Sequence, residues 1–194
     1  MILFTPLKTK KIVPYDWDEW WHIWNTYSAV VSKKYENHNN AIGTWKGLDL
    51  YTKIKYKMIY EAPHAPKSKL IDDLIEQIQN TIPIHIVKVR VIENFIEVPY
   101  HADHSYPKNE LRCFLWNNYD TPVWSFSYKN TERQLVMPSD SNTYYYRDFP
   151  LQHHSVYDPT KSKGVMAIYG MPKSNFTEFI DDSATHYKNY AWVI

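Results

Sequence analysis

Two short segments of the chain carry histidine and carboxylate side chains at a spacing that suits metal binding. In His101-Ala102-Asp103 the imidazole and the carboxylate are two residues apart, and residues i and i+2 of an extended segment point to the same side. The second segment, His153-His154, places its second histidine 53 residues after His101. If the fold brings the two segments together, two imidazoles and one carboxylate can hold a divalent metal ion and leave coordination positions open.

The residues around these two segments are typical of short β-strands. The run Ile84–Ile92 is rich in β-branched residues and has Lys88 and Arg90 inside it. Further strands are expected at residues 111–116, 123–128, 134–136, 142–146 and 165–169, with turn residues between them. Many short strands at close spacing predict a mainly β fold, a jelly-roll or cupin-like double-stranded β-helix. In such a fold the two histidine segments can face each other across the mouth of the barrel.

Two helices are expected ahead of this β region, packed on its outside. Asp16 can cap the first, at about residues 17–31, with Glu19 as its capping-box partner. Its tryptophans recur at i, i+3, i+4 and i+7, a spacing that predicts one face docked on a sheet: Trp17, Trp20, Trp21 and Trp24. The second helix, at about residues 69–80, follows Ser68 and should end before Pro83. Its buried stripe is expected to consist of Leu70, Ile71, Leu74, Ile75 and Ile78.

Two further segments have weaker patterns. Residues 52–60 alternate between apolar and lysine side chains, which predicts a half-buried strand with a solvated lysine face. The chain from about Pro172 onward is expected to be irregular or partly helical.

Composition is consistent with a single globular domain over residues 1–194, with its β core at about residues 84–170. The formal net charge of +1 does not suggest a nucleic-acid partner, because such domains are usually strongly basic. The one cysteine, Cys113, cannot form an intramolecular disulfide, and no apolar stretch has the length of a signal peptide or a membrane span. We therefore expect a soluble cytoplasmic protein with no membrane partner.

Four segments of the β region follow one another in the order EVPYHAD, RCFLWN, SDSNTYYYRDFPLQHHSV and GVMAIYG. In their order and spacing they resemble the core of the 2-oxoglutarate/Fe(II)-dependent oxygenases, most closely the short phage and bacterial forms of the aspartyl/asparaginyl β-hydroxylase and prolyl hydroxylase-like group. It implies His101, Asp103 and His154 as Fe(II) ligands, with 2-oxoglutarate and O2 as co-substrates. It also implies oxidative decarboxylation of the oxoacid to succinate, coupled to hydroxylation of a peptide, an amino acid or another small molecule.

Two other histidines compete for the metal. His104 directly follows Asp103, and His153 directly precedes His154, so in extended segments each would face the side opposite to its neighbour. We expect His154 to be the ligand, because the Ser-Val and Asp-Pro-Thr after it match the pattern of the family it resembles.

The sequence departs from this family at the cation that holds the oxoacid. Members usually carry an arginine on the strand after the distal histidine, and the corresponding position here is Gly164. Arg112 lies eleven residues after His101, on the strand that follows the HxD turn, where some branches of the family carry their oxoacid-binding cation. It is expected to take this role, and its guanidinium can bind a carboxylate through two parallel hydrogen bonds. Lys163 and Arg90 are the alternatives.

Two rival functions remain open from the sequence. Two histidines and one carboxylate can also hold catalytic zinc, so a cupin-like metal-dependent hydrolase or isomerase needs the same ligands but no oxoacid cation. A non-catalytic, aromatic-rich β-sandwich could instead bind a sugar, a peptide or single-stranded nucleic acid by stacking, and it would need no metal.

Overall fold

The computed structural model describes residues 1–30, 45–53, 62–94, 98–101, 110–116, 124–147, 151–155 and 163–194. Only the backbone is described at residues 45, 94, 98–101, 110–116, 124, 152–155 and 163. The helices are α1 (Trp17–Tyr27), α2 (Lys69–Thr81) and α3 (Phe176–His186). The strands are β1 (Ile2–Pro6), β2 (Ala29–Val30), β3 (Trp45–Thr52), β4 (Ile84–Asn94), β5 (Val98–His101), β6 (Glu110–Trp116), β7 (Trp124–Tyr128), β8 (Thr131–Gln134), β9 (Thr143–Tyr146), β10 (Gln152–Ser155), β11 (Lys163–Pro172) and β12 (Trp192–Val193).

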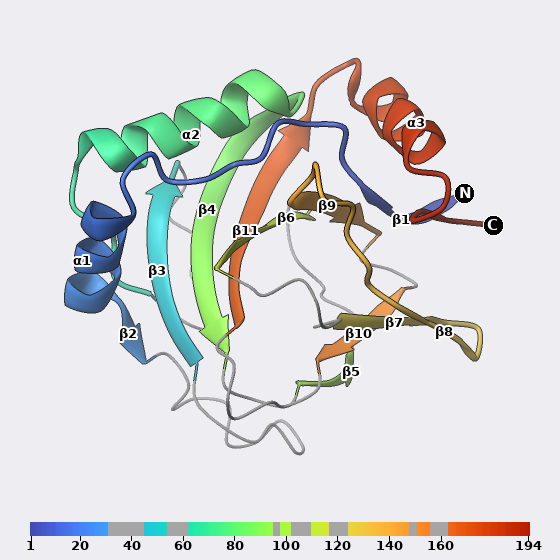
Figure 1. The fold of residues 1–194 in the computed structure, drawn as a ribbon, viewed down its shortest axis with the longest axis horizontal. Helices are drawn as coiled ribbons and strands as arrows, with labels where there is room; N and C mark the ends of the chain where they lie inside the picture. The colour runs from blue at the N-terminus through green and yellow to red at the C-terminus, as the bar shows by residue number, and fades with distance from the viewer. Residues whose placement is uncertain are drawn as a thin grey trace.

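These strands form two antiparallel sheets, so the expected mainly β architecture is confirmed. The larger sheet has eight strands in the order β12-β1-β9-β6-β11-β4-β3-β2, and the smaller has four in the order β5-β10-β7-β8. In Figure 1 the smaller sheet lies at the lower right, while α1 and α2 lie along the left and top of the larger sheet. The two strands that carry the histidine segments, β5 and β10, are neighbours in the smaller sheet.

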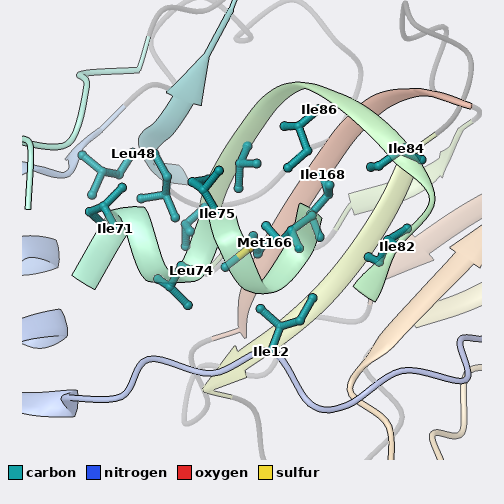
Figure 2. Packing of buried hydrophobic residues seen from close by; sticks show 14 of the residues in the cluster. Ile12, Leu48, Ile71, Leu74, Ile75, Ile82, Ile84, Ile86, Met166 and Ile168 are labelled. Carbon is teal, nitrogen blue, oxygen red and sulfur yellow. The ribbon is translucent and has the colours of Figure 1, made fainter. Parts of the chain in front are cut away.

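Helix α2 covers the outer face of the larger sheet, as its stripe predicts. All five expected residues are buried: Leu70, Ile71, Leu74, Ile75 and Ile78. Figure 2 shows part of this stripe lying over Ile86 of β4 and over Met166 and Ile168 of β11. The Ser68 hydroxyl caps the helix by accepting a hydrogen bond from the Ile71 N–H at 3.3 Å. The helix ends at Thr81, ahead of Pro83, where a proline disfavours further helical turns.

Helix α1 is shorter than the predicted residues 17–31. Asp16 caps it as expected, since its side chain accepts from the Glu19 N–H at 2.9 Å. The helix ends at Tyr27 because Ser28 is extended, with ψ 145°, and the chain then pairs with β3 as β2. Trp20 and Trp24 are buried and stacked, but Trp17 and Trp21 are 38% and 36% exposed, so only half of the tryptophan stripe is docked.

Other boundaries also differ from the sequence-based expectations. The strand expected at residues 134–136 lies at Thr131–Gln134, because Lys129 and Asn130, with φ 47° and 63°, make a two-residue turn straight out of β7. The alternating segment 52–60 lies outside the described residues beyond Lys53, and Thr52 ends β3. The segment after Pro172 contains α3, in agreement with the expected partial helix.

Candidate functional site

The larger sheet has two faces with different surroundings. On β11, Met166 and Ile168 belong to the apolar cluster under α2, whereas Val165 belongs to a second cluster with Phe126 of the smaller sheet. The face that carries Val165 is therefore turned toward the smaller sheet, and we call it the inner face. Because strand neighbours alternate, Ala167 belongs to the inner face as well.

A row of directly paired residues crosses this inner face. Asp49 on β3 pairs with Arg90 on β4, and Arg90 pairs with Ala167 on β11. Ala167 pairs in turn with position 112 on β6, which pairs with Tyr144 on β9. Directly opposite positions in an antiparallel sheet share a face. Since strands lie about 4.8 Å apart, positions 90 and 112 are separated by about 10 Å.

Three charged residues converge at the β3–β4 end of the row. Arg90 donates from Nε to Asp49 Oδ1 at 2.5 Å and from Nη2 to Asp49 Oδ2 at 3.0 Å. Lys88 Nζ lies 3.0 Å from the same Oδ2. All three residues are buried, with exposed fractions of 4% for Asp49, 7% for Lys88 and 4% for Arg90. We call this group the inner-face cluster.

Within this cluster, burial has the largest effect on Lys88. Loss of hydration lowers the pKa of Lys88 below its usual 10.5, and the nearby positive charge of Arg90 lowers it further. The carboxylate of Asp49 opposes both effects by attraction and by its hydrogen bond. The surroundings of Lys88 therefore disfavour its charged form, although it forms a salt bridge with Asp49.

A β-bulge places these charges on the inner face. The register between β4 and β11 shifts so that Tyr169 pairs with Lys88 and Gly170 with Ile86, which leaves one extra residue on β4 at Val87. Without this shift, Ile86 would share a face with Lys88. With it, Ile86 packs in the outer core under α2 and Lys88 lies on the inner side.

The smaller sheet has a matching row. Phe126 on β7 pairs with His153 on β10, and His153 pairs with His101 on β5. The Phe126 ring is buried against Phe4 and Tyr146 of the larger sheet, with centroid distances of 5.2 and 5.6 Å. The row that includes positions 101 and 153 therefore belongs to the face turned toward the larger sheet.

The predicted metal ligands are described only in part. His101 ends β5 and His154 lies in β10, where its backbone pairs with Ser125 rather than with His101. Asp103 and His104 lie outside the described residues. The backbone thus brings the two predicted histidine segments onto adjacent strands, with His153 as the residue directly opposite His101.

The three predicted oxoacid cations have different positions. Arg112 occupies the inner-face row in the middle of β6. Lys163 begins β11 and pairs with Asn94 at the far end of β4. Arg90 is held by Asp49 within the inner-face cluster.

Sequence reasoning missed Asp49 and the role of Lys88. Asp49 is 41 residues from Arg90, and nothing in the sequence pairs the two. Lys88 and Arg90 lie inside a β-branched run, where charged residues are usually excluded unless paired. This pattern could have indicated a buried partner of opposite charge.

Among the side chains that the structure describes, no group of three histidine, cysteine, aspartate or glutamate residues is placed to hold a metal ion. His101, Asp103 and His154 are not in that set of side chains. Within the described residues, no helix has the length and apolar character needed to span a membrane. No protein-family model and no curated protein sequence matches the chain.

Proposed function

We propose that the chain is a 2-oxoglutarate/Fe(II)-dependent oxygenase built on a double-stranded β-helix. The support comes from how the eight consecutive strands β4 to β11 pair. The first pairs with the last, the second with the seventh, the third with the sixth and the fourth with the fifth. Two further pairings, β11 with β6 and β10 with β7, join these hairpin pairs into two sheets. This is the order expected when one long antiparallel hairpin wraps into a jelly roll.

The observation that carries the proposal is the pairing of β5 with β10. It sets His101 beside the two consecutive histidines of β10, on strands whose inner face is turned toward the larger sheet. Asp103 lies two residues after the end of β5 in the sequence. Two imidazoles and one carboxylate suit Fe(II). Bound there, Fe(II) would supply the oxygen chemistry that couples decarboxylation of 2-oxoglutarate to substrate hydroxylation.

The inner-face row supports Arg112 as the residue that holds the oxoacid. A carboxylate that loses water on entering the protein needs a cation or several hydrogen bonds in return. Position 112 shares the inner face with Ala167 and Tyr144, whereas Gly164 has no side chain to offer. Arg90, one of the alternatives, already donates two hydrogen bonds to Asp49.

The third ligand comes from β10, where two observations favour different histidines. The residues after His154 match the pattern of the family that the sequence resembles, and this makes His154 the proposed ligand. The backbone register makes His153 the alternative, because His153 is the direct partner of His101.

Anaerobic titration with Fe(II) and 2-oxoglutarate tests the function. In this titration we expect the weak visible charge-transfer band of a chelated oxoacid, and in a separate assay with O2 admitted we expect slow formation of succinate. His101→Ala, Asp103→Ala and His154→Ala should each remove most Fe(II) binding, while His153→Ala and His104→Ala should retain it. If His153→Ala loses Fe(II) binding and His154→Ala retains it, His153 is the ligand and the proposed function is unaffected.

The outcome that overturns the proposal is equally specific. If the chain turns over a substrate with zinc and the oxoacid has no effect, it is a metal-dependent hydrolase or isomerase. If the purified chain binds neither Fe(II) nor zinc, the non-catalytic binding module is the better description.

A further inference from the structure

Exposed apolar side chains are concentrated on helix α1 and on the residues next to it. Of the twelve large apolar side chains that are exposed among the described residues, six fall between positions 13 and 30: Val13, Tyr15, Trp17, Trp21, Tyr27 and Val30. Trp17 and Trp21 are four residues apart, so they are neighbours on the helix surface. Apolar side chains that gather on a surface mark an interaction site, whereas scattered ones do not. We call the surface formed by Tyr15, Trp17, Asp18 and Trp21 the α1 patch.

The charge around the α1 patch is negative. Residues 13–30 contain Asp16, Asp18 and Glu19 and no lysine or arginine, although the whole chain has a formal net charge of +1. Asp18 is three residues before Trp21, a spacing at which side chains are neighbours on a helix. The patch therefore combines aromatic rings with carboxylates, and such a surface attracts cations and repels anions.

One cation of the chain already lies at the edge of this patch. Lys69 Nζ is 5.3 Å from the centre of the Tyr15 ring, in the geometry of a cation–π contact, and 2.7 Å from Asp73. The Tyr15 hydroxyl donates a hydrogen bond to Glu19 at 3.3 Å. An ammonium thus lies between an aromatic face and a carboxylate beside α1. A cationic partner would repeat this arrangement on Trp17.

We propose that the α1 patch binds a basic polypeptide. Its arginine or lysine side chains lie over the rings of Trp17 and Trp21, and Asp18 pairs with one of their charges. Tryptophan is the aromatic side chain that binds cations best, and the planar guanidinium of arginine also stacks on aromatic faces.

The negative charge distinguishes this occupant from others. The carboxylates of Asp16, Asp18 and Glu19 would repel a nucleic acid or an anionic membrane surface. A second copy docked through the same patch would bring like charges together, which is costly at an interface. In Figure 1, α1 lies at the left of the molecule and strands β5 and β10 lie at the lower right, so this surface is independent of the predicted metal site.

The test is an NMR titration of the full chain with hexa-arginine, followed through the indole N–H signals of Trp17 and Trp21. Each signal is assigned by its loss from Trp17→Leu or Trp21→Leu, variants that keep an apolar side chain and remove the aromatic face. Asp18→Asn, at an exposed residue, tests the same surface without changing its packing. Circular dichroism confirms that each variant folds, and hexaglutamate is the probe of opposite charge.

Two matched control variants remove similar groups from another part of the surface. Tyr190→Leu removes an aromatic ring that is 40% exposed. Asp181→Asn removes an exposed carboxylate of α3, a helix that also exposes Glu178 and Asp182 but contains no tryptophan.

We expect both indole signals to shift with hexa-arginine and not with hexaglutamate. Trp17→Leu, measured at the Trp21 signal, and Asp18→Asn should each weaken hexa-arginine binding about two- to fivefold, as for one exposed cation–π contact or one exposed ion pair. The two control variants should bind hexa-arginine as the wild type does.

Three results would overturn the proposal: no shift of the indole signals with hexa-arginine, equal shifts with hexaglutamate, or equal affinities in the wild type, Trp17→Leu and Asp18→Asn. Two further results overturn it by giving the patch another occupant. If the signals move with protein concentration alone and the mass in solution doubles, the patch is an interface between copies of the chain. If they broaden with phosphatidylserine vesicles and not with hexa-arginine, it is a membrane-binding surface.

Discussion

The two faces of β4 have different chemical surroundings. On the outer face, Val89 and Val91 pack with Ile86 in the apolar cluster under α2. On the inner face, Lys88 and Arg90 gather around Asp49. Adjacent residues of one strand thus lie in an apolar core and in a buried charged cluster.

The difference between these faces is energetic as well as chemical. Apolar burial stabilises the fold in proportion to the area removed from water and requires little directional accuracy. Buried charges are costly unless their geometry is precise, and an ion pair is weak evidence for stability. Apolar packing therefore accounts for the stability of the outer face, whereas the inner face combines a second apolar cluster with the buried charges and is where binding should be sought.

The largest expected effect is on the inner face. Asp49→Asn removes the negative charge between two buried cations and should lower the free energy of unfolding by about 3–5 kcal/mol. Urea denaturation followed by circular dichroism measures it. Asp182→Asn, at an exposed pair with Lys8, should change the same quantity by less than about 1 kcal/mol. Similar small losses in both variants would contradict a charged cluster that depends on Asp49.

The outer face should respond through packing alone. Leu74 is fully buried in α2, and Leu74→Ala should cost about 2–5 kcal/mol because it leaves a cavity between the helix and the sheet. The affinities of the folded variant for 2-oxoglutarate and for Fe(II) should stay unchanged. Val136→Ala, at a residue that is 55% exposed, serves as the control and should change stability by less than about 0.5 kcal/mol. A change of ligand affinity in Leu74→Ala would show that the two faces are coupled.

Arg112→Ala should weaken ligand binding and leave stability unchanged, which is the opposite of the effect expected for Leu74→Ala. We expect its 2-oxoglutarate affinity to fall about a hundredfold or more, because the carboxylate loses a charge-assisted fork. Unfolding free energy and Fe(II) binding should stay near those of the wild type. Lys163→Ala should do little in the same anaerobic titration, and the reverse result would assign the oxoacid to the beginning of β11.

The smallest expected effect is a dependence of stability on pH. Burial lowers the pKa of Lys88 in the folded protein, whereas the unfolded chain keeps the usual value of 10.5. Between these two values the unfolded chain binds more protons, so stability should rise as pH increases through this window. The rise should be absent in Lys88→Met, as measured by urea denaturation from neutral pH toward pH 10.5. A stability that falls in the wild type relative to the variant would contradict a depressed pKa.

Local patterns were sufficient for several elements. The apolar stripe that begins at Leu70 and Ile71 and recurs along the helix predicts α2. Ser68 caps α2 and Asp16 caps α1, as their side-chain chemistry predicts. The β-branched run from Ile84 predicts β4. These signals are local because helix periodicity, capping hydrogen bonds and β-branched side chains act over a few residues.

The candidate site needed more than local patterns. The residue types of the histidine segments suggested metal chemistry, but β5 and β10, four residues each, were too short to stand out as strands. Their pairing, which sets His101 opposite His153, depends on contacts 52 residues apart. The sequence pattern alone favoured His154, since register is a property of two strands together.

The sequence by itself determined which residues could form helices, strands and a metal-binding set, because those properties belong to single residues and their near neighbours. Only the tertiary structure decided that Asp49 meets Arg90 across 41 residues, and that a bulge at Val87 turns Lys88 inward while Ile86 stays outside. One inserted residue reverses the facing of every later side chain in a strand. No local pattern records that reversal, because it follows from how β4 pairs with β11.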